Sequence, residues 1–322
     1  MDLPTEYNWR PLRLDDIDQL VAMYARWEER HDLLFRSDRA ELGSDLAHPD
    51  GDLATRSICA LDSGGTIRGI GWVFRRDQTG VSKQRALVWA IPDPDHSHLE
   101  EHLIRWATET ASGLLDGLDD GLDKVLRAWS PSHIADRIGR FEAQGFHVAR
   151  YFATLSRPVA GAPDPVPPDG ITLVDWDQAA HGRAIFEAHR EAFSDHWGSV
   201  PPDWEAWQSD HVDDEHTRLD LSPVALAGDA VVGYSLNQVW PDDVEVRGLT
   251  EAYLGAIGVR KTWRRRGVAT ALILESIRRI AAAGLDNATL TTDTDSLTGA
   301  FALYTQLGFE EVNVDVTLVK EL

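Results

Sequence analysis

Hydrophobic and polar positions follow one succession twice along this chain. Residues 58–74 (ICALDSGGTIRGIGWVF) and 223–239 (PVALAGDAVVGYSLNQV) are apolar runs broken by a glycine turn, which is typical of a β-hairpin. Each hairpin follows a stretch with apolar residues at three-to-four spacing, residues 17–30 and 178–193, which predicts a helix. The sequence therefore predicts two copies of one α/β unit.

The succession continues after each hairpin with a strand, a loop and an amphipathic helix. In the second copy the strand is residues 253–259, and the helix ends at about residue 283. Each copy closes with a Gly-Phe turn and further strands, and a proline-rich stretch separates the copies. We expect a first domain at 1–158, a linker at 159–169 and a second domain at 170–322.

Composition narrows the possible partners. The chain has 322 residues, 43% of them apolar, and a net charge of -22, which argues against binding to nucleic acid or to an anionic membrane. We find no signal-peptide pattern and no apolar run long enough to span a membrane, so we expect a cytoplasmic protein. The single cysteine, Cys59, lies in an apolar strand and is expected to be buried. We expect no metal, because His196 has no Cys or His partner at ligand spacing.

One loop departs from the acidic background. In RKTWRRRGVATAL, residues 260–272, five basic residues fall within seven positions directly before a predicted helix. Unpaired N–H groups at a helix N-terminus, small residues and arginine forks together suit a pyrophosphate. The alternative is a solvated basic helix cap. The corresponding loop of the first copy, IPDPDHSHLEEHL, has neither glycine nor arginine.

These residues carry a resemblance to a known family. Arg264, Gly267 and Ala269 match the Arg/Gln-x-x-Gly-x-Gly/Ala motif of the GCN5-related N-acetyltransferases, the GNAT family. Residues 293–312, with Tyr304 and the turn at Gly308, resemble its second signature. The tandem arrangement is similar to that of mycothiol synthase and related actinobacterial two-domain acetyltransferases. The resemblance implies a mixed, mostly antiparallel sheet flanked by helices in each domain.

The resemblance also implies acetyl-CoA as co-substrate, held between strands 253–259 and 288–293. Backbone of Ile257 and Val259 would pair with the pantetheine arm, and N–H groups of residues 265–270 would hold the pyrophosphate. Ser296 stands where the family often has Asn. The full set of implied cofactor contacts is Ile257, Gly258, Val259, Arg264, Arg265, Arg266, Gly267, Val268, Ala269, Thr270, Ser296 and Tyr304.

For the catalytic acid we choose Tyr304, since a phenol can protonate a departing thiolate; the alternative is a core aromatic residue. Its counterpart in the first copy, counted from the Gly-Phe turns, is Phe141, so we expect the first domain to be non-catalytic. The family commonly has a Glu as base where this chain has Gly255. Strand alternation suggests Glu251 instead, unless it is an exposed strand-end charge, and Asp293 and His196 remain in reserve.

The acceptor site is expected within residues 191–216, which are rich in Trp and carboxylates and suit a cationic amine. We place Asp195, His196 and Trp197 in it, and Trp240 as a further candidate; the alternative is a Trp-packed surface loop. The predicted function is acetyl transfer from acetyl-CoA to a small-molecule amine, by direct attack in a ternary complex. The alternatives are transfer of a longer acyl group and a non-catalytic acyl-CoA-binding or sensing protein. The oligomeric state is not predicted.

Overall fold

The computed structural model describes residues 3–34, 36–48, 51–75, 83–197, 202–240, 248–295 and 299–322. The chain forms two compact units, Met1–Tyr151 with Val314–Leu322, and Phe152–Asn313. These units do not coincide with the expected domain boundaries. Residues 152–158 belong to the second unit and Val314–Leu322 to the first, because two long strands pass from one unit into the other.

In the first unit the strands follow the order β1-β2-β3-β4-β5-β12. Among the described pairs only β4 and β5 run parallel. The elements that belong wholly to this unit are β1 (Asn8–Arg10), α1 (Ile17–Arg30), α2 (Arg39–Ala47), α3 (Leu53–Arg56), β2 (Ser57–Leu61), β3 (Ile67–Phe74), β4 (Lys83–Pro92), α4 (Leu99–Asp116), β5 (Asp123–Pro131) and α5 (Ala135–Glu142).

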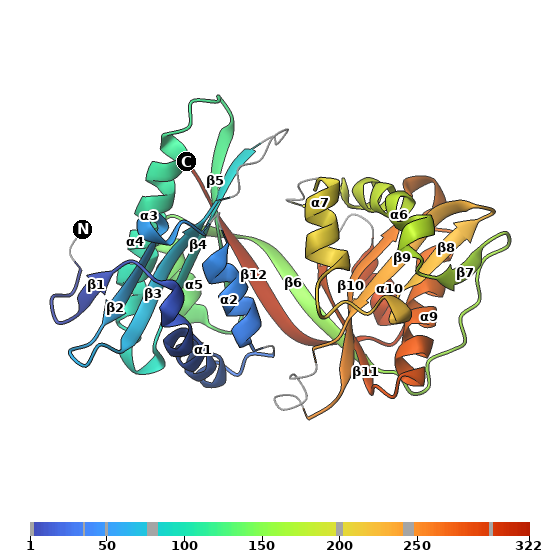
Figure 1. Ribbon diagram of the computed structural model, residues 1–322, viewed down its shortest axis with the longest axis horizontal. Coiled ribbons are helices and arrows are strands. Elements are labelled where there is room, and N and C mark those ends of the chain that lie inside the picture. The colour runs from blue at the N-terminus through green and yellow to red at the C-terminus, as the bar shows by residue number, and fades with distance from the viewer. Residues whose placement is uncertain are drawn as a thin grey trace. The chain divides into compact units, whose positions relative to one another are not determined.

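Helices cover both faces of this sheet, as Figure 1 shows. The predicted helix at residues 17–30 is confirmed as α1, which buries Leu20, Met23, Tyr24 and Trp27 against one face. Their spacing of three and four residues places them on one side of the helix. Cys59 belongs to the same core and is fully buried, so that prediction is also confirmed. Helices α4 and α5 pack on the opposite face.

In the second unit the order is β7-β8-β9-β10-β11-β6, and β10 and β11 are its parallel pair. The elements that belong wholly to this unit are β7 (Thr172–Asp175), α6 (Gln178–Phe193), α7 (Trp204–Trp207), β8 (Pro223–Ala227), β9 (Ala230–Gln238), β10 (Glu251–Val259), α9 (Val268–Ala282), β11 (Asn287–Asp293) and α10 (Ala300–Gln306).

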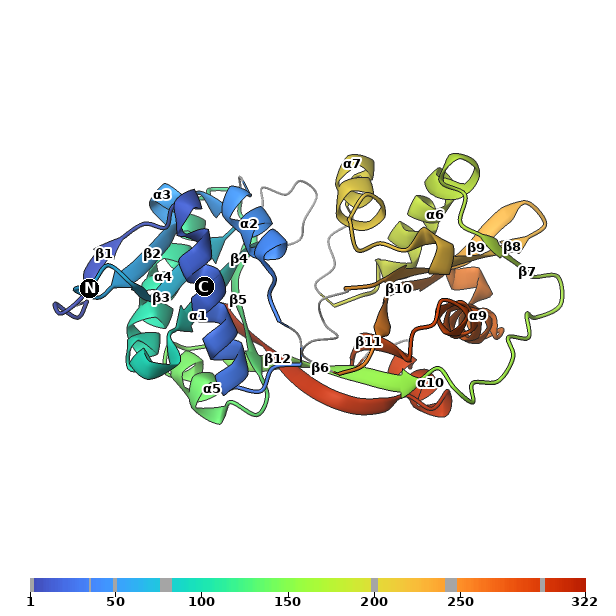
Figure 2. The same cartoon turned by 60° about the horizontal axis from the view of Figure 1, so that its bottom comes forward.

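Figure 2 shows α6 and α7 on one face of this sheet and α9 on the other. The predicted helix at residues 178–193 is confirmed as α6, which begins where Asp177 accepts hydrogen bonds from the N–H groups of Ala179 and Ala180. Such a cap satisfies two of the four free donors of a helix start. Both hairpins, β2–β3 and β8–β9, are also confirmed. The fold class is therefore the mixed α/β fold that the sequence predicts, present in two copies.

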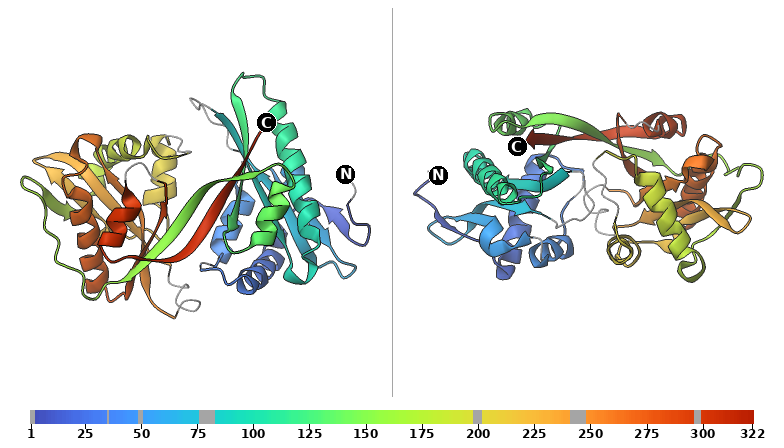
Figure 3. Two further views of the ribbon diagram at one scale, coloured as in Figure 1. Left: turned by 180° about the vertical axis from the view of Figure 1, so that it is seen from behind. Right: turned by 90° about the horizontal axis from the view of Figure 1, so that it is seen from above.

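Strands β6 (His147–Pro158) and β12 (Glu310–Glu321) connect the units and can be followed in Figure 3. Within the second unit, β6 pairs with β11 from Phe152↔Asp293 to Pro158↔Asn287. Within the first unit, β12 pairs with β5 from Asp315↔Pro131 to Glu321↔Val125. Each half of the chain thus completes the sheet of the other unit. Within the described residues, no helix combines the length and apolar character that crossing a membrane requires.

Candidate active site

The two parallel strands of the second unit separate partway along their length. Strand β10 pairs with β11 only through Glu251↔Asn287 to Tyr253↔Thr289. Beyond that point the register of β10 with β9 shifts between Leu254 and Ala256, which leaves Gly255 as the extra residue of a bulge. Bulges bend a strand away from its neighbour. The two strands therefore diverge and leave backbone groups that no neighbouring strand satisfies.

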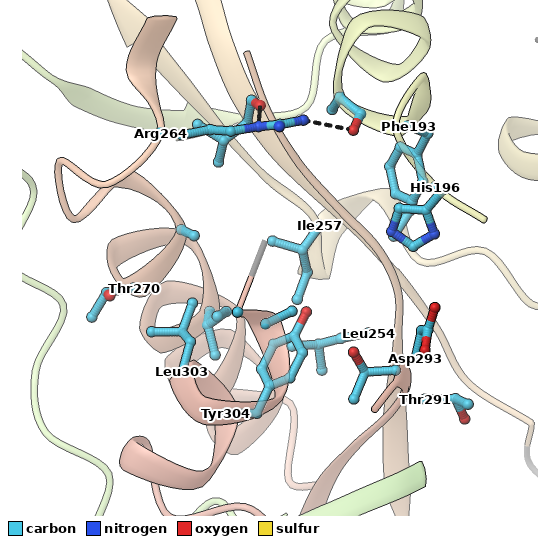
Figure 4. Close-up of a pocket in the computed structure, with 18 of the residues that line it drawn as sticks. Phe193, His196, Leu254, Ile257, Arg264, Thr270, Thr291, Asp293, Leu303 and Tyr304 are labelled. Carbon is cyan, nitrogen blue, oxygen red and sulfur yellow. Dashed lines mark hydrogen bonds between the residues drawn. The ribbon is translucent and has the colours of Figure 1, made fainter. Parts of the chain in front are cut away.

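A cavity of about 570 Å³ occupies the gap between these strands. Its walls come from β6, β10, β11, α10, the end of α6, the loop before α9 and the start of α9, and Figure 4 shows most of the side chains that line it. Of the predicted strand contacts, Ile257 and Val259 line it. The structure thus brings residues as far apart in the chain as Phe152 and Tyr304 to one concave site, which is the usual form of a ligand pocket.

The basic loop forms one end of the cavity. Arg264, Arg265, Gly267, Ala269 and Thr270 all line it. Gly267 has a φ of 84° and Arg265 a φ of 59°, so the chain turns sharply before α9 begins. Among the described residues no side chain caps α9, and its first backbone bond is donated by the Ala271 N–H to the Gly267 carbonyl. The preceding N–H groups at the helix start are therefore available to an anion.

Arg264 is already engaged by the protein, which the motif did not reveal. Its guanidinium donates to the carbonyls of Val259 and Ala192 and to the Asp195 carboxylate, and two of these bonds are drawn in Figure 4. The side chain therefore ties the end of β10 to the end of α6. Arg265, the next residue along the chain, also lines the cavity.

Two predicted contacts of this loop lie elsewhere. The Arg266 guanidinium lies over the Trp263 ring, 5.1 Å from its centroid, and Arg266 is not among the lining residues. The Val268 side chain is buried in the core beneath α9. Neither side chain reaches the cavity, so only their backbone N–H groups remain candidates for phosphate contacts.

Gly258 is required by the packing of the core and does not line the cavity. It lies opposite Tyr234 on β9, and a Cβ there would meet the Tyr234 ring at 2.4 Å. The Tyr234 hydroxyl is fixed by a 2.6 Å hydrogen bond to Nδ1 of His189 on α6. Gly258 is absent from the lining residues, so the predicted cofactor contact is limited to its backbone, and the glycine itself serves the core.

Tyr304 on α10 lies on the cavity wall with its hydroxyl directed into the cavity beneath Ile257 (Figure 4). Its ring packs edge-on against Phe309 of the Gly-Phe turn, with centroids 6.0 Å apart. Desolvation by the surrounding protein raises the pKa of Tyr304 to about 12. The phenol therefore keeps its proton at neutral pH and is a hydrogen-bond donor.

The structure does not bring Glu251 to the cavity. Its side chain is buried at the start of β10, where it accepts a hydrogen bond from the Thr289 hydroxyl at 2.5 Å, and it is not a lining residue. The strand still runs paired at this point, so no space opens beside the carboxylate. Neither the predicted base nor the alternative of an exposed strand-end charge agrees with this position.

Two further residues, Asp293 and His196, are the remaining candidates for the base. His196 and Asp293 both line the cavity, and Figure 4 shows the carboxylate beneath the imidazole ring. Desolvation lowers the pKa of His196, while the Asp293 charge raises it, and the net lowering favours the neutral imidazole at neutral pH. The ring remains solvent-accessible, so it can pass a proton to water.

Of the remaining residues predicted for the acceptor site, one lines the cavity and two do not. Asp195 lines the cavity and accepts hydrogen bonds from Lys261 at 2.8 Å and from Arg264 at 3.1 Å, which hold the pKa of Asp195 below its usual value. Trp197 and Trp240 are not lining residues; the Trp240 ring stacks on His216 with centroids 5.2 Å apart. Ser296 lies outside the described residues.

The sequence interpretation did not single out two aromatic residues of the wall, Phe152 and Phe193, although Phe193 lies within the expected acceptor segment 191–216. Phe193 ends α6 and packs between the rings of His189 and His196, at 4.6 and 4.8 Å. Its place at the end of a predicted helix was the signal that could have indicated it. Phe152 comes from the first half of the chain through β6, and nothing in its neighbourhood along the sequence indicates a role in the second unit.

A group of three or more His, Cys, Asp or Glu side chains fit to hold a metal ion does not occur among the residues that the structure describes. The cavity wall thus offers backbone N–H groups, a phenol, an imidazole and carboxylates. This set can bind an anion at one end, and donate and accept protons at the other.

Comparison with known proteins finds a family whose model matches the part of the chain that holds these features. Residues 182–309 match the model of the acetyltransferase (GNAT) family. A mycothiol acetyltransferase of Thermomonospora curvata is 25% identical over 63% of this chain and 66% of its own length, so the match spans just under two thirds of that relative.

Two solved structures share the fold across the whole chain. A GCN5-related N-acetyltransferase from Sphaerobacter thermophilus has a TM-score of 0.79 at 22% identity, covering 99% of this chain and 97% of that one. A tandem GNAT protein from the clavulanic acid biosynthesis pathway has a TM-score of 0.68 at 16% identity, covering 98% of both.

At these identities the solved structures show the fold alone, which is that of a tandem GNAT protein. The family match falls on the half of the chain that holds the uncapped helix start, Tyr304 and the open cavity. Residues 182–309, which hold most of the cavity wall, therefore match the acetyltransferase (GNAT) family.

Proposed function

We propose that the second unit transfers the acetyl group of acetyl-CoA to the amine of a small molecule. The observation that carries this proposal is the single cavity in which a phenol, a neutral imidazole and an uncapped helix N-terminus face the same gap between diverging strands. The kinship with a relative named mycothiol acetyltransferase supports a small-molecule acceptor.

In this proposal the pyrophosphate of acetyl-CoA binds the N–H groups at the start of α9, with Arg265 beside it. Gly267 and Ala269 line this end of the cavity, and a Cβ on Gly267 would meet only Pro168, at 3.5 Å. The glycine is therefore required by its φ of 84° and by the need for backbone to approach a ligand, rather than by protein packing. The pantetheine amides pair with the backbone of Ile257 and Val259, which β11 does not reach.

The reaction removes two protons from the charged amine nitrogen and supplies one to the sulfur of the leaving thiolate. An alkylamine with a pKa of about 10.4 is almost wholly charged at pH 7, so a base contributes by taking its proton. We assign this role to His196, with Asp293 beneath it to stabilise the imidazolium. The neutral amine nitrogen forms a bond to the thioester carbonyl carbon, and the carbon–sulfur bond breaks. Tyr304 donates its proton to the departing thiolate, and the second proton lost by the amine nitrogen as the amide forms restores the Tyr304 hydroxyl.

The charges around the entrance fit a cationic acceptor. Asp195, Asp293 and the aromatic Phe193 all line the cavity, and the chain as a whole is strongly acidic. A protonated amine is attracted to such a wall before it gives up its proton. The cytoplasmic location and the lack of nucleic-acid or membrane partners stay predictions from the sequence.

A panel of small-molecule amines, incubated with acetyl-CoA while released thiol is followed, tests this function. We expect thiol release that depends on the amine and an N-acetylated product by mass spectrometry. Tight acetyl-CoA binding without acetylation of any amine would contradict an enzyme and favour the acyl-CoA-binding alternative. A preference for a longer acyl-CoA over acetyl-CoA would show that the transferred group is a longer acyl chain rather than acetyl.

A further inference from the structure

The first unit has the same parallel pair of strands as the second, and that pair also separates. Strand β4 pairs with β5 through Lys83↔Asp123 to Leu87↔Arg127. Beyond this point β4 continues beside β3, and β5 continues beside β12. The geometry that opens a cavity in the second unit is therefore present in the first as well.

The gap in the first unit is occupied by the Arg137 side chain of α5, which is 1% exposed. Its Nη1 donates to the Ala90 carbonyl of β4 at 2.8 Å, and its Nη2 reaches the Trp129 carbonyl of β5 at 3.5 Å. The guanidinium thus bridges the two strands at the point where they no longer bond each other. Its carbon lies 5.4 Å from the Trp27 ring and 5.2 Å from the Phe141 ring.

An internal anion completes this cluster. Arg137 forms an ion pair with one oxygen of Glu100, and Arg140 pairs with the other oxygen. Glu100 is the second residue of α4 and is 3% exposed. A buried carboxylate in the first turn of a helix is stabilised by the helix dipole, as a bound phosphate would be. Pairing on both oxygens offsets the cost of burying this charge.

The residues of this cluster correspond in position to residues of the cavity wall in the second unit. Counted from the Gly-Phe turns, Arg137, Arg140 and Phe141 correspond to Ala300, Leu303 and Tyr304. Counted from the helix starts, Glu100 corresponds to Ala269. Counted from the last parallel pair of each unit, the acceptors Ala90 and Trp129 correspond to Ala256 and Thr291. All six counterparts line the cavity.

We infer that Glu100 and Arg137 fill the co-substrate site of the first unit with the chain's own side chains, so that the protein takes up one acetyl-CoA, in the second unit. The carboxylate takes the place of a phosphate at the helix start. The guanidinium takes the place of pantetheine amides on the strand carbonyls. The inference rests on the proposed function for the identity of the ligand.

The stoichiometry of acetyl-CoA on the full chain tests this inference, measured by native mass spectrometry and calorimetric titration. We expect one equivalent for the natural protein and none for Gly267→Glu. Two equivalents, or one remaining in Gly267→Glu, would overturn the inference and leave the proposed function intact. No binding to the natural protein would instead remove the proposed function, while the first unit would still take none.

Introducing the same Glu–Arg pair into the second unit tests directly whether such a pair excludes acetyl-CoA. Ala269→Glu with Ala300→Arg places the same pair in the second unit, and we expect acetyl-CoA binding to be lost. Ala281→Glu with Ala302→Arg is the matched control, because both alanines are exposed on α9 and α10, and binding should be unchanged. A folded transplant that binds as the natural protein does would overturn the inference; if the transplant does not fold, the stoichiometry above decides.

Discussion

At the scale of the residue, chemical type and position in the chain do not suffice to assign a role. Gly258 and Gly267 are nine positions apart, and both were predicted to contact the cofactor. Gly258 is required because a Cβ there would collide with the Tyr234 ring, whereas a Cβ on Gly267 would make only an ordinary contact with Pro168, and the φ of Gly267 is left-handed. Only the second has the properties of a ligand-binding glycine.

The Tyr304→Phe substitution tests whether Tyr304 is the acid that protonates the departing thiolate. The substitution removes one hydroxyl from the wall and keeps the ring against Phe309. We expect turnover to fall by about 10²–10⁴-fold, the usual contribution of a positioned acid, with little change in the affinity for acetyl-CoA. Steady-state rates and a calorimetric titration on the same variant check both parts. Unchanged turnover would remove Tyr304 as the acid.

The pH dependence of His196 follows from its environment. Because desolvation lowers the pKa of this imidazole, the neutral form that accepts a proton is lost only as the pH falls below the ordinary value of about 6.5. We expect kcat/KM to fall on the acid side of that value, and His196→Gln to lose this limb together with most of the activity. His147, exposed in the first unit, supplies the control: His147→Gln should keep the natural profile. An acid limb that persists in His196→Gln would assign it to another group.

At the scale of the element, the two separating strand pairs show one backbone feature used in two ways. Around β10 and β11 the gap holds a cavity, and around β4 and β5 it holds a buried ion pair. The difference lies in helices α5 and α10, which contribute Arg137 in one unit and Ala300 in the other. The strands set the position of the gap, and the following helix decides whether it is open.

Arg137→Ala should therefore destabilise the first unit. Truncating one partner of a buried ion pair leaves the other charge uncompensated, which typically costs about 3–5 kcal/mol. Glu100→Leu with Arg137→Met removes both charges and should recover much of this loss, because apolar residues of similar volume often replace buried pairs without penalty. Free energies of unfolding from urea titrations check both variants. A double variant as unstable as Arg137→Ala would show that the charges themselves are needed.

At the scale of the whole molecule, neither half of the chain contains a complete unit. Strand β6 belongs to the first half by sequence, yet residues 152–158 pair along β11 and bring Phe152 to the cavity. Strand β12 completes the first unit in return. The first half of the chain therefore supplies one strand of the second unit, beside the cavity.

Residues 170–322 produced alone should consequently fail to bind acetyl-CoA and should unfold without a cooperative transition. Strand β11, which buries Ala288 and Leu290, would lose its partner, and β12 would lose β5. Co-production of residues 1–169 should restore binding, because it restores both strand pairs. Thermal unfolding and calorimetric titration of the fragment and of the reconstituted pair measure this. A lone fragment that binds as the full chain does would show that the exchange is dispensable.

The sequence by itself determined the two-copy α/β organisation, helices 17–30 and 178–193, both hairpins and the burial of Cys59. These features depend on local periodicity and turn residues, which act between neighbours in the chain. It also indicated the loop before α9 and Tyr304, because the motif residues stand close together along the chain.

Only the tertiary structure decided the strand exchange, the burial of Glu251 away from the cavity, the position of His196 above Asp293, and the ion pair of Glu100 with Arg137. Each of these depends on contacts between distant segments, such as β6 with β11 or α4 with α5. Strand alternation could place Glu251 on a face of β10, but it could not show where β10 and β11 cease to pair. That point, set by the bulge at Gly255, decides which carboxylates face a cavity and which are sealed in a sheet.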